Sequence, residues 1–352
     1  MKKILKKVIT ALWCIICMCT TAAAQDTHFS QYNASPLVLN PALSGLSNGD
    51  YRVYTNFRSQ WMTVSKASAY RSFAAGADMA VGKVTRYNSF AGLGISFLNT
   101  QAGVIRLSTN RLDLTFAYHF MLNHRGTQQI SLGVQGGFNM RTIDPSRAVY
   151  DSQYDPVSGT LNPYAAGESY GKTKVLFADA GAGVLYSGIF KRGNHLYLGF
   201  AMAHLNRPNV SFQPSGLEAP DKAQQRLAMK YTIHGGMLLP MGKRLALMPN
   251  FMVLVQGTAN EFNLGLHLRS ALGNMKTSAT YLYFGAQYRG LVDAVIVSGR
   301  MDIKGFTMGL SYDINISKLL PATKTVGAPE ISLMYQGSFK KKPRPWHCPA
   351  MI

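Results

Sequence analysis

The chain has 352 residues, of which 47% are hydrophobic and 11% aromatic, so it is long enough to bury a large core and too apolar for a disordered protein. Charged residues make up only 15% of the chain, below the roughly 25% of an average soluble domain. The net charge of +20 suggests a nucleic-acid-binding protein. However, eight of the positive charges lie at the chain ends, four lysines near the N-terminus and four basic residues in the last thirteen. The remaining positive charge forms no dense stripe, so we expect no nucleic-acid partner.

Residues 1–24 have the pattern of a secretory signal peptide. A basic start precedes the apolar run Val8–Cys19, which is too short for a membrane-spanning helix, and Thr21–Ala24 supply small residues before Gln25. We expect cleavage after Ala24 rather than lipidation at Cys19, because no small residue directly precedes that cysteine. Three of the four cysteines would leave with this peptide, so no intrachain disulfide is expected. The pattern indicates an exported protein.

Residues 25–50 are rich in Asn, Pro and Ser and have no periodicity, so we expect an irregular segment before the first strand. Within it, Gly45–Gly49 satisfies the G-x-S-x-G pattern of a nucleophile elbow. That elbow needs a strand before it and a helix after it. Here Asn40 and Pro41 precede the pattern and a strand is expected to follow, which favours a glycine-rich loop.

From residue 51 onward, apolar residues alternate with polar or small residues. In 112–120, for example, Leu, Phe and Tyr alternate with Asp, Thr, Ala and His. Successive side chains of a strand point to opposite faces, so each such segment has one apolar and one polar face. The pattern predicts about fourteen strands: 51–58, 69–81, 87–98, 107–120, 128–141, 175–189, 194–204, 227–237, 245–256, 260–270, 276–287, 291–302, 304–313 and 328–339.

Half-buried strands of a soluble sandwich would show the same alternation, but three features favour a membrane barrel. The segments have the length of a tilted membrane strand, their apolar faces often end in Tyr or Phe, and their polar faces combine Gly and Ala with charged residues. A sheet in lipid must close, because unpaired edges are not tolerated there. We therefore expect an all-β chain with a transmembrane antiparallel barrel over 51–339.

The connections between the strands differ in length. Those at 124–126 and 191–194 are short, whereas 142–174 and 206–226 are long and rich in Pro, Gly, Ser and Asn. Outer-membrane barrels keep long loops outside and short turns in the periplasm. With an even strand number, both chain ends are expected in the periplasm. The basic tail 340–352 is expected to be solvated, or to contact anionic lipid or a periplasmic partner.

No pattern for catalysis, a cofactor or a metal stands out. No histidine pair has a metal-binding spacing, and no P-loop or complete G-x-G-x-x-G is present. Several strands carry charged residues that must face the lumen and find partners there. They are Asp78, Asp113, Asp179, Asp293, Asp302, Asp313, Arg58, Arg71, Arg111, Arg141, Arg269, Arg289 and Arg300. We expect a structural network, with ion or solute selectivity as the alternative, and we expect no enzyme activity.

Six short motifs resemble those of a known family. The segment 28–42 contains HFSQY and LNPA, residues 57–61 are FRSQW, and three further motifs follow in order at 288–294, 309–313 and 330–335. Together they resemble the PorP/SprF family of type IX secretion system outer-membrane proteins of the Bacteroidetes. The resemblance covers about residues 25–339, with a departure at Ser59 and Met62 and a tail beyond the terminal aromatic Phe339.

The resemblance implies an integral outer-membrane barrel that serves type IX secretion or gliding. It implies as partners outer-membrane lipid, a periplasmic ring lipoprotein or peptidoglycan-binding protein, and in some paralogues a secreted adhesin with a C-terminal sorting domain. The irregular segment 25–50 is expected to plug the lumen or to bind a periplasmic partner. As partner-binding residues the motifs indicate His28, Phe29, Gln31, Tyr32, Asn40, Pro41, Arg58, Gln60 and Trp61.

The main alternative is a passive porin or small-solute transporter of the outer membrane, which would have an open lumen. A surface lipid hydrolase inside a barrel is less favoured, because no Ser, His and acidic set can be placed at the membrane edge from the sequence.

Overall fold

The computed structural model describes residues 26–62, 69–82, 89–123, 126–148, 153–155, 158–161, 172–212, 226–273, 280–290, 293–317 and 327–339. The predicted signal peptide 1–24 and the predicted tail 340–352 lie outside these residues. No helix in these ranges is long and apolar enough to cross a membrane.

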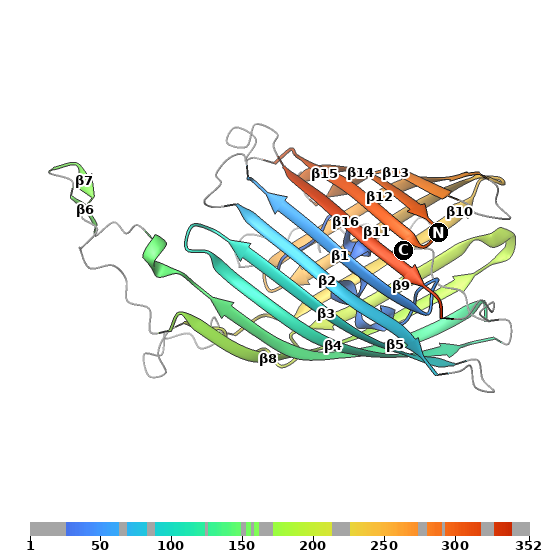
Figure 1. Ribbon diagram of the computed structural model, residues 1–352, viewed down its shortest axis with the longest axis horizontal. Helices are drawn as coiled ribbons and strands as arrows, with labels where there is room; N and C mark the ends of the chain where they lie inside the picture. The colour runs from blue at the N-terminus through green and yellow to red at the C-terminus, as the bar shows by residue number, and fades with distance from the viewer. Residues whose placement is uncertain are drawn as a thin grey trace, which may run out of the picture.

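Fourteen antiparallel strands form a closed barrel, which confirms the predicted fold class (Figure 1). The strands are β1 (Tyr51–Gln60), β2 (Tyr70–Val81), β3 (Phe90–Ala102), β4 (Leu107–Met121), β5 (Gln128–Thr142), β8 (Lys174–Ile189), β9 (His195–Ala203), β10 (Lys230–Pro240), β11 (Leu245–Gln256), β12 (Ala259–Leu272), β13 (Thr280–Arg289), β14 (Ala294–Ile303), β15 (Phe306–Asn315) and β16 (Ala328–Gly337). Each strand pairs with its chain neighbour, and β1 closes the barrel on β16 with Tyr51 opposite Gly337.

The burial pattern of the strands distinguishes a membrane barrel from a sandwich. Along β4, Leu112, Leu114 and Phe116 are exposed, whereas Asp113 and Thr115 between them are buried. A soluble sandwich would bury the apolar set and expose the polar set. Here the polar set lines the lumen and the apolar set forms an outer belt that only lipid can cover.

The two ends of the barrel differ in their longest connections. The connections after β2, β4, β8, β10, β12 and β14 are short and share the end at which β1 begins and β16 ends. The connections after β5 and β9 are the longest and lie at the other end. The first of these holds the 3-10 helix η3 (Pro145–Arg147) and a two-stranded hairpin, β6 (Tyr154–Asp155) with β7 (Thr160–Leu161). We call the two ends the short-turn end and the long-loop end.

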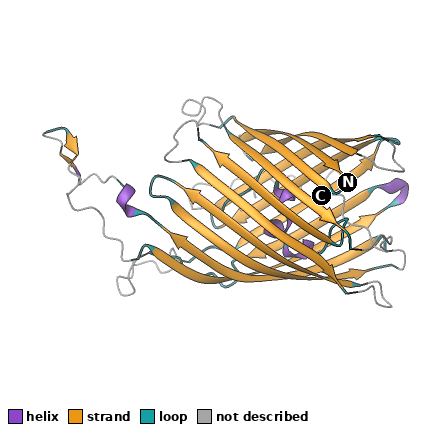
Figure 2. Ribbon diagram, in the orientation of Figure 1, coloured by secondary structure: helices purple, strands orange, loops and turns teal. Residues whose placement is uncertain are grey.

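The N-terminal segment lies inside the barrel. It contains three short helices, η1 (Tyr32–Ala34), α2 (Pro36–Leu39) and η2 (Pro41–Leu43), which appear within the ring of strands in Figure 2. Pro36 and Pro41 each occupy the first turn of a helix, where a missing N–H costs nothing. A further 3-10 helix, η5 (Lys191–Gly193), lies in a short turn. We call residues 26–50 the plug.

Candidate functional site

The plug runs through the lumen from the long-loop end to the short-turn end. Asp26 contacts His204 and Lys230, which adjoin the long β9–β10 loop, and the chain reaches the start of β1 at the opposite end. Residues 26–50 therefore occupy the lumen, as the first of the two roles expected for this segment requires. The expectation that both chain ends share one end holds for the barrel ends Tyr51 and Gly337 but is wrong for Asp26, because the plug doubles back along the barrel axis.

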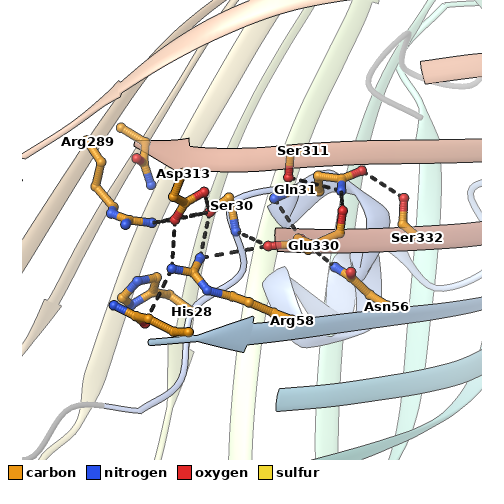
Figure 3. A network of polar contacts seen from close by, with 12 residues as sticks. His28, Ser30, Gln31, Asn56, Arg58, Arg289, Ser311, Asp313, Glu330 and Ser332 are labelled. Atoms are coloured by element: carbon orange, nitrogen blue, oxygen red, sulfur yellow. Dashed lines mark hydrogen bonds and ion pairs between the residues drawn. The ribbon is translucent and has the colours of Figure 1, made fainter. Parts of the chain in front are cut away.

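Ser30 of the plug is the meeting point of four distant parts of the wall (Figure 3). Its hydroxyl donates to the carboxylate of Asp313 at 2.7 Å and accepts from Arg58 Nη1 at 2.5 Å and Arg289 Nη1 at 3.2 Å. Asp313 also lies 2.8 Å from Arg58 Nη2 and 2.8 Å from Arg289 Nη1. The strands β1, β13 and β15 thus hold one plug side chain through one shared carboxylate.

Glu330 on β16 binds the plug backbone beside this point. One carboxylate oxygen accepts the Ser30 N–H at 2.8 Å, and the other accepts the Gln31 N–H at 2.9 Å and the Asn56 side-chain amide at 2.9 Å. The Gln31 side chain donates to Ser311 Oγ at 3.1 Å and accepts from Ser332 Oγ at 2.8 Å. Each oxygen of the Glu330 carboxylate thus accepts one of two successive plug N–H groups. This pair of bonds fixes the direction in which the plug backbone passes β16.

The charges in this network balance inside a dry site. Arg58 and Arg289 face Asp313 and Glu330, and at most 4% of any of these four side chains is exposed. Arg289 also pairs with Asp293, whose side chain is 54% exposed. Removing one partner of a buried pair leaves an uncompensated charge and costs about 3–5 kcal/mol. The network can therefore position the plug strongly, although the intact ion pairs add little net stability.

A second polar cluster holds the plug at the long-loop end. His204 lies between two carboxylates, with Nε2 2.7 Å from Asp26 Oδ2 and Nδ1 2.7 Å from Asp179 Oδ2, and Lys230 Nζ is 3.2 Å from Asp26. Burial of the ring opposes its protonation, but Asp26 and Asp179 outweigh burial and hold the pKa of His204 above its ordinary value. Burial likewise disfavours ionised Asp26, but Lys230 and His204 hold the pKa of this carboxyl well below its ordinary value. Nearby, His28 Nδ1 is 2.9 Å from Glu261.

The later part of the plug is held by close packing. Leu39, Ala42, Leu43 and Leu46 form a buried cluster together with wall side chains. The wall approaches them through glycines: a Cβ on Gly133 would lie 2.3 Å from the backbone nitrogen of Ala42. Glycines at such positions let a second backbone approach the sheet.

Polar contacts fix both ends of this packed part. The Asn40 side chain accepts the Ala42 N–H at 2.9 Å and lies 3.1 Å from His234 Nε2. Arg52 and Asp78 form a fully buried pair at 2.8 Å at the other end. The Gly45 N–H donates to Asp78, and Arg52 donates to the carbonyl oxygens of Leu43 and Leu46.

The predicted partner-binding residues are mostly internal contacts of the plug. Phe29 is 3% exposed and packs with Ala74 and Leu98, and the Tyr32 hydroxyl donates to Asn250 at 2.9 Å. Pro41 is buried. Gln60 and Trp61 lie partly exposed at the end of β1, and Trp61 stacks edge-on against Tyr70 at 5.3 Å. Their role toward a partner stays a prediction, whereas their role in seating the plug is visible.

The structure adds anchors that the predicted set lacks: Ser30, Glu330, His204 and Lys230. Ser30 and Glu330 lie within the quoted motifs, so the motifs were the available signal for them. Arg289 and Asp313 were expected only as part of a lumen network, and they do face the lumen. Arg71 departs from that expectation, because it is exposed near the long-loop end of β2.

Other chemical possibilities find little support in the described part of the chain. Ser47 of the G-x-S-x-G pattern is 2% exposed and donates to the Gly49 carbonyl at 2.7 Å, and β1 follows it instead of a helix. The described ranges contain no group of three His, Cys, Asp or Glu placed to hold a metal ion. Between η1 and the wall lies a cavity of about 80 Å³, lined by Tyr32, Asn250, Gln287 and Arg300 among others. Its lining is mixed, and the polar groups in it are suited to bind ordered water.

Comparisons with known proteins agree with this architecture. The model of the family described as "Type IX secretion system membrane protein PorP/SprF" matches residues 21–335. A comparison with curated proteins finds no match.

Among solved structures, the chain is similar to the Ralstonia pickettii toluene transporter TbuX, with 11% identity over 91% of this chain and 96% of that one, at a TM-score of 0.50. The CymD monoaromatic hydrocarbon channel matches with 10% identity over 91% and 95% of the two chains, at a TM-score of 0.48. At these identities, the likeness concerns the fold alone.

Proposed function

The chain belongs to the PorP/SprF family of type IX secretion system membrane proteins, and from this premise we propose that it serves protein export as a plugged outer-membrane barrel. Its signal peptide would direct it across the inner membrane and be removed after Ala24. Its work would be to hold other proteins at the outer membrane, without enzyme activity of its own. In a gliding member of the Bacteroidetes, the exported proteins would include surface adhesins.

The partners follow from the two ends of the barrel. The short-turn end would contact a periplasmic ring lipoprotein or a peptidoglycan-binding protein. The long-loop end would face the exported protein, which for an adhesin-specific paralogue is one large sorted adhesin. Membership of the family supports a role among the secretion components, and the named partners are our proposal.

The observation that carries the proposal is the occupied lumen. A protein that passes solutes by diffusion needs an open path, whereas this lumen holds a plug that is hydrogen-bonded to buried charged side chains of β1, β13, β15 and β16. A barrel that acts by holding partners needs no open path. The likeness to hydrocarbon channels concerns the fold and does not favour the porin alternative.

The test is purification of the tagged protein from its own outer membrane in a gentle detergent, followed by mass spectrometry and single-channel recording. We expect periplasmic type IX components or one sorted adhesin to co-purify, and we expect the purified barrel to be closed. Recovery of the barrel alone, with steady conductance in planar bilayers, would establish the porin alternative instead.

A deletion of residues 26–45 separates the plug from the barrel. We expect the shortened chain to insert and to conduct, while secretion falls. If the deleted form inserts and secretion remains complete, the plug has no part in export.

A further inference from the structure

The two ends of the barrel differ in the sign of their charges. The six short turns hold nine Lys and Arg and no Asp or Glu in the sequence: Lys83, Arg86, Arg125, Lys191, Arg192, Lys243, Arg244, Lys276 and Lys304. The seven connections at the long-loop end hold nine basic residues but also seven acidic ones: Asp144, Asp151, Asp155, Glu168, Glu218, Asp221 and Asp293. These six turns are therefore basic because they lack acidic residues. The structure describes cations in three of them, the turns 190–194, 241–244 and 304–305, and we call these three turns the basic rim.

The described cations of the basic rim are accessible. Lys191, Lys243, Arg244 and Lys304 are all exposed. Asp50 adjoins this end of the barrel, but one of its carboxylate oxygens accepts the Phe339 N–H at 2.6 Å. The positive charge of the rim therefore faces outward rather than into the lumen network.

Each turn of the basic rim also adjoins an exposed apolar side chain of the outer belt. These are Phe190, Met241 and Phe306, one for each turn. Apolar residues at the edge of the belt mark the depth at which acyl chains give way to head groups. Lys and Arg at that depth lay their stems along apolar surface and extend their charges to the phosphates.

We propose that the basic rim binds the head groups of anionic phospholipids, of the phosphatidylglycerol class, in the periplasmic leaflet. The placement of the described cations favours lipid over an acidic protein, because each of the three turns of the rim places positive charge within two residues of a lipid-facing side chain. Anionic lipid attracts each Lys or Arg near the surface, and the attraction weakens as salt rises. This inference does not depend on the role in secretion.

The test uses the full-length protein in nanodiscs of equal parts phosphatidylethanolamine and phosphatidylglycerol. The protein is extracted with a mild detergent, and the retained lipids are quantified by mass spectrometry at low and high salt. We expect phosphatidylglycerol to be enriched about three-fold or more over the bulk ratio at low salt, with the enrichment falling at high salt.

Two matched variants locate the effect. The rim variant K191Q/K243Q/R244Q/K304Q should return the lipid ratio to the bulk value. The control R106Q/K172Q/K174Q/R207Q removes four exposed positive charges near the long-loop end and should retain the enrichment. A bulk ratio for the unaltered protein, or an equal loss in both variants, would overturn the proposal. A bulk lipid ratio would leave an acidic protein as the ligand of the rim.

Discussion

Replacing Asp313 by Asn tests whether the buried ion network holds the plug. The carboxylate of Asp313 lies 2.8 Å from both Arg58 and Arg289 and is 2% exposed, so solvent screens neither pair. Asn has the same shape but directs an uncharged amide at two guanidinium groups. Arg58 then keeps only Glu330, at 3.8 Å, and Arg289 keeps only the half-exposed Asp293. Losing one partner of a buried pair costs about 3–5 kcal/mol. We expect the D313N variant to lose that much free energy of unfolding.

The assay is urea unfolding of the protein in lipid vesicles, followed by tryptophan fluorescence. Trp61 is a local reporter, because it lines the same small cavity as Arg289 and Asp313. The double variant R289Q/D313N removes one charge of each sign and leaves Arg58 facing Glu330. It should therefore lose less than D313N alone, with a coupling energy of about 0.5–3 kcal/mol.

The matched control is D144N, which breaks the exposed Asp144–Arg147 pair at 2.8 Å. Exposed pairs contribute about 0–1 kcal/mol, so D144N should be nearly neutral. If D313N were as stable as the unaltered protein, or if the two substitutions at 289 and 313 were additive, the ion network would not be what seats the plug.

Three further predictions concern the plug. Because the pKa of His204 is raised and that of Asp26 is lowered, the cluster of Asp26, His204, Asp179 and Lys230 should be most stable between the two values. The His204 contribution should disappear as pH rises through its raised pKa, and the Asp26 contribution as pH falls through its lowered pKa. Limited proteolysis of the plug across pH measures both. H204Q should remove the alkaline step and move the acid step to higher pH, because His204 helps to lower the pKa of Asp26. In β5, G133A should lower the free energy of unfolding by about 1–3 kcal/mol, because the new methyl would lie 2.3 Å from plug backbone. The control G136A, whose nearest neighbour is 4.0 Å away, should have little effect. Equal effects of the two substitutions in urea unfolding would contradict the close approach of plug and wall. An epitope tag placed directly before Asp26 should bind antibody on intact cells, while a tag in the 304–305 turn should need permeabilised cells. The reverse result would mean that the long-loop end faces the periplasm, and accessibility of both tags from one side would contradict the path of the plug.

The path of the plug also constrains assembly. The segment lies along the barrel axis and is bonded to strands from both ends of the chain, including β1 and β16, which close the barrel. The backbone of its packed part lies against wall glycines on β3 and β5. A finished barrel would have to admit the segment through a lumen that the same segment fills. The plug is therefore expected to be in place when β1 pairs with β16.

The barrel could be predicted from the sequence, including its fourteen strands, the two faces of each strand and the positions of the longest connections. Alternation has a period of two residues and is local, so it is visible without knowing which strands pair. The choice between a sandwich and a membrane barrel was also predictable, because the segments were long and their apolar faces ended in aromatic residues.

Only the tertiary structure decided how the plug lies and what holds it. Ser30 meets Asp313 across 283 positions of sequence and Glu330 across 300, and an irregular segment has no periodicity from which such contacts could be derived. Closure of the sheet brings β1, β13, β15 and β16 around one point, and that closure turns separate motifs into one network. The position of Asp26 at the long-loop end depends on the same three-dimensional arrangement, because strand parity fixes where β1 begins but not where the preceding segment leads.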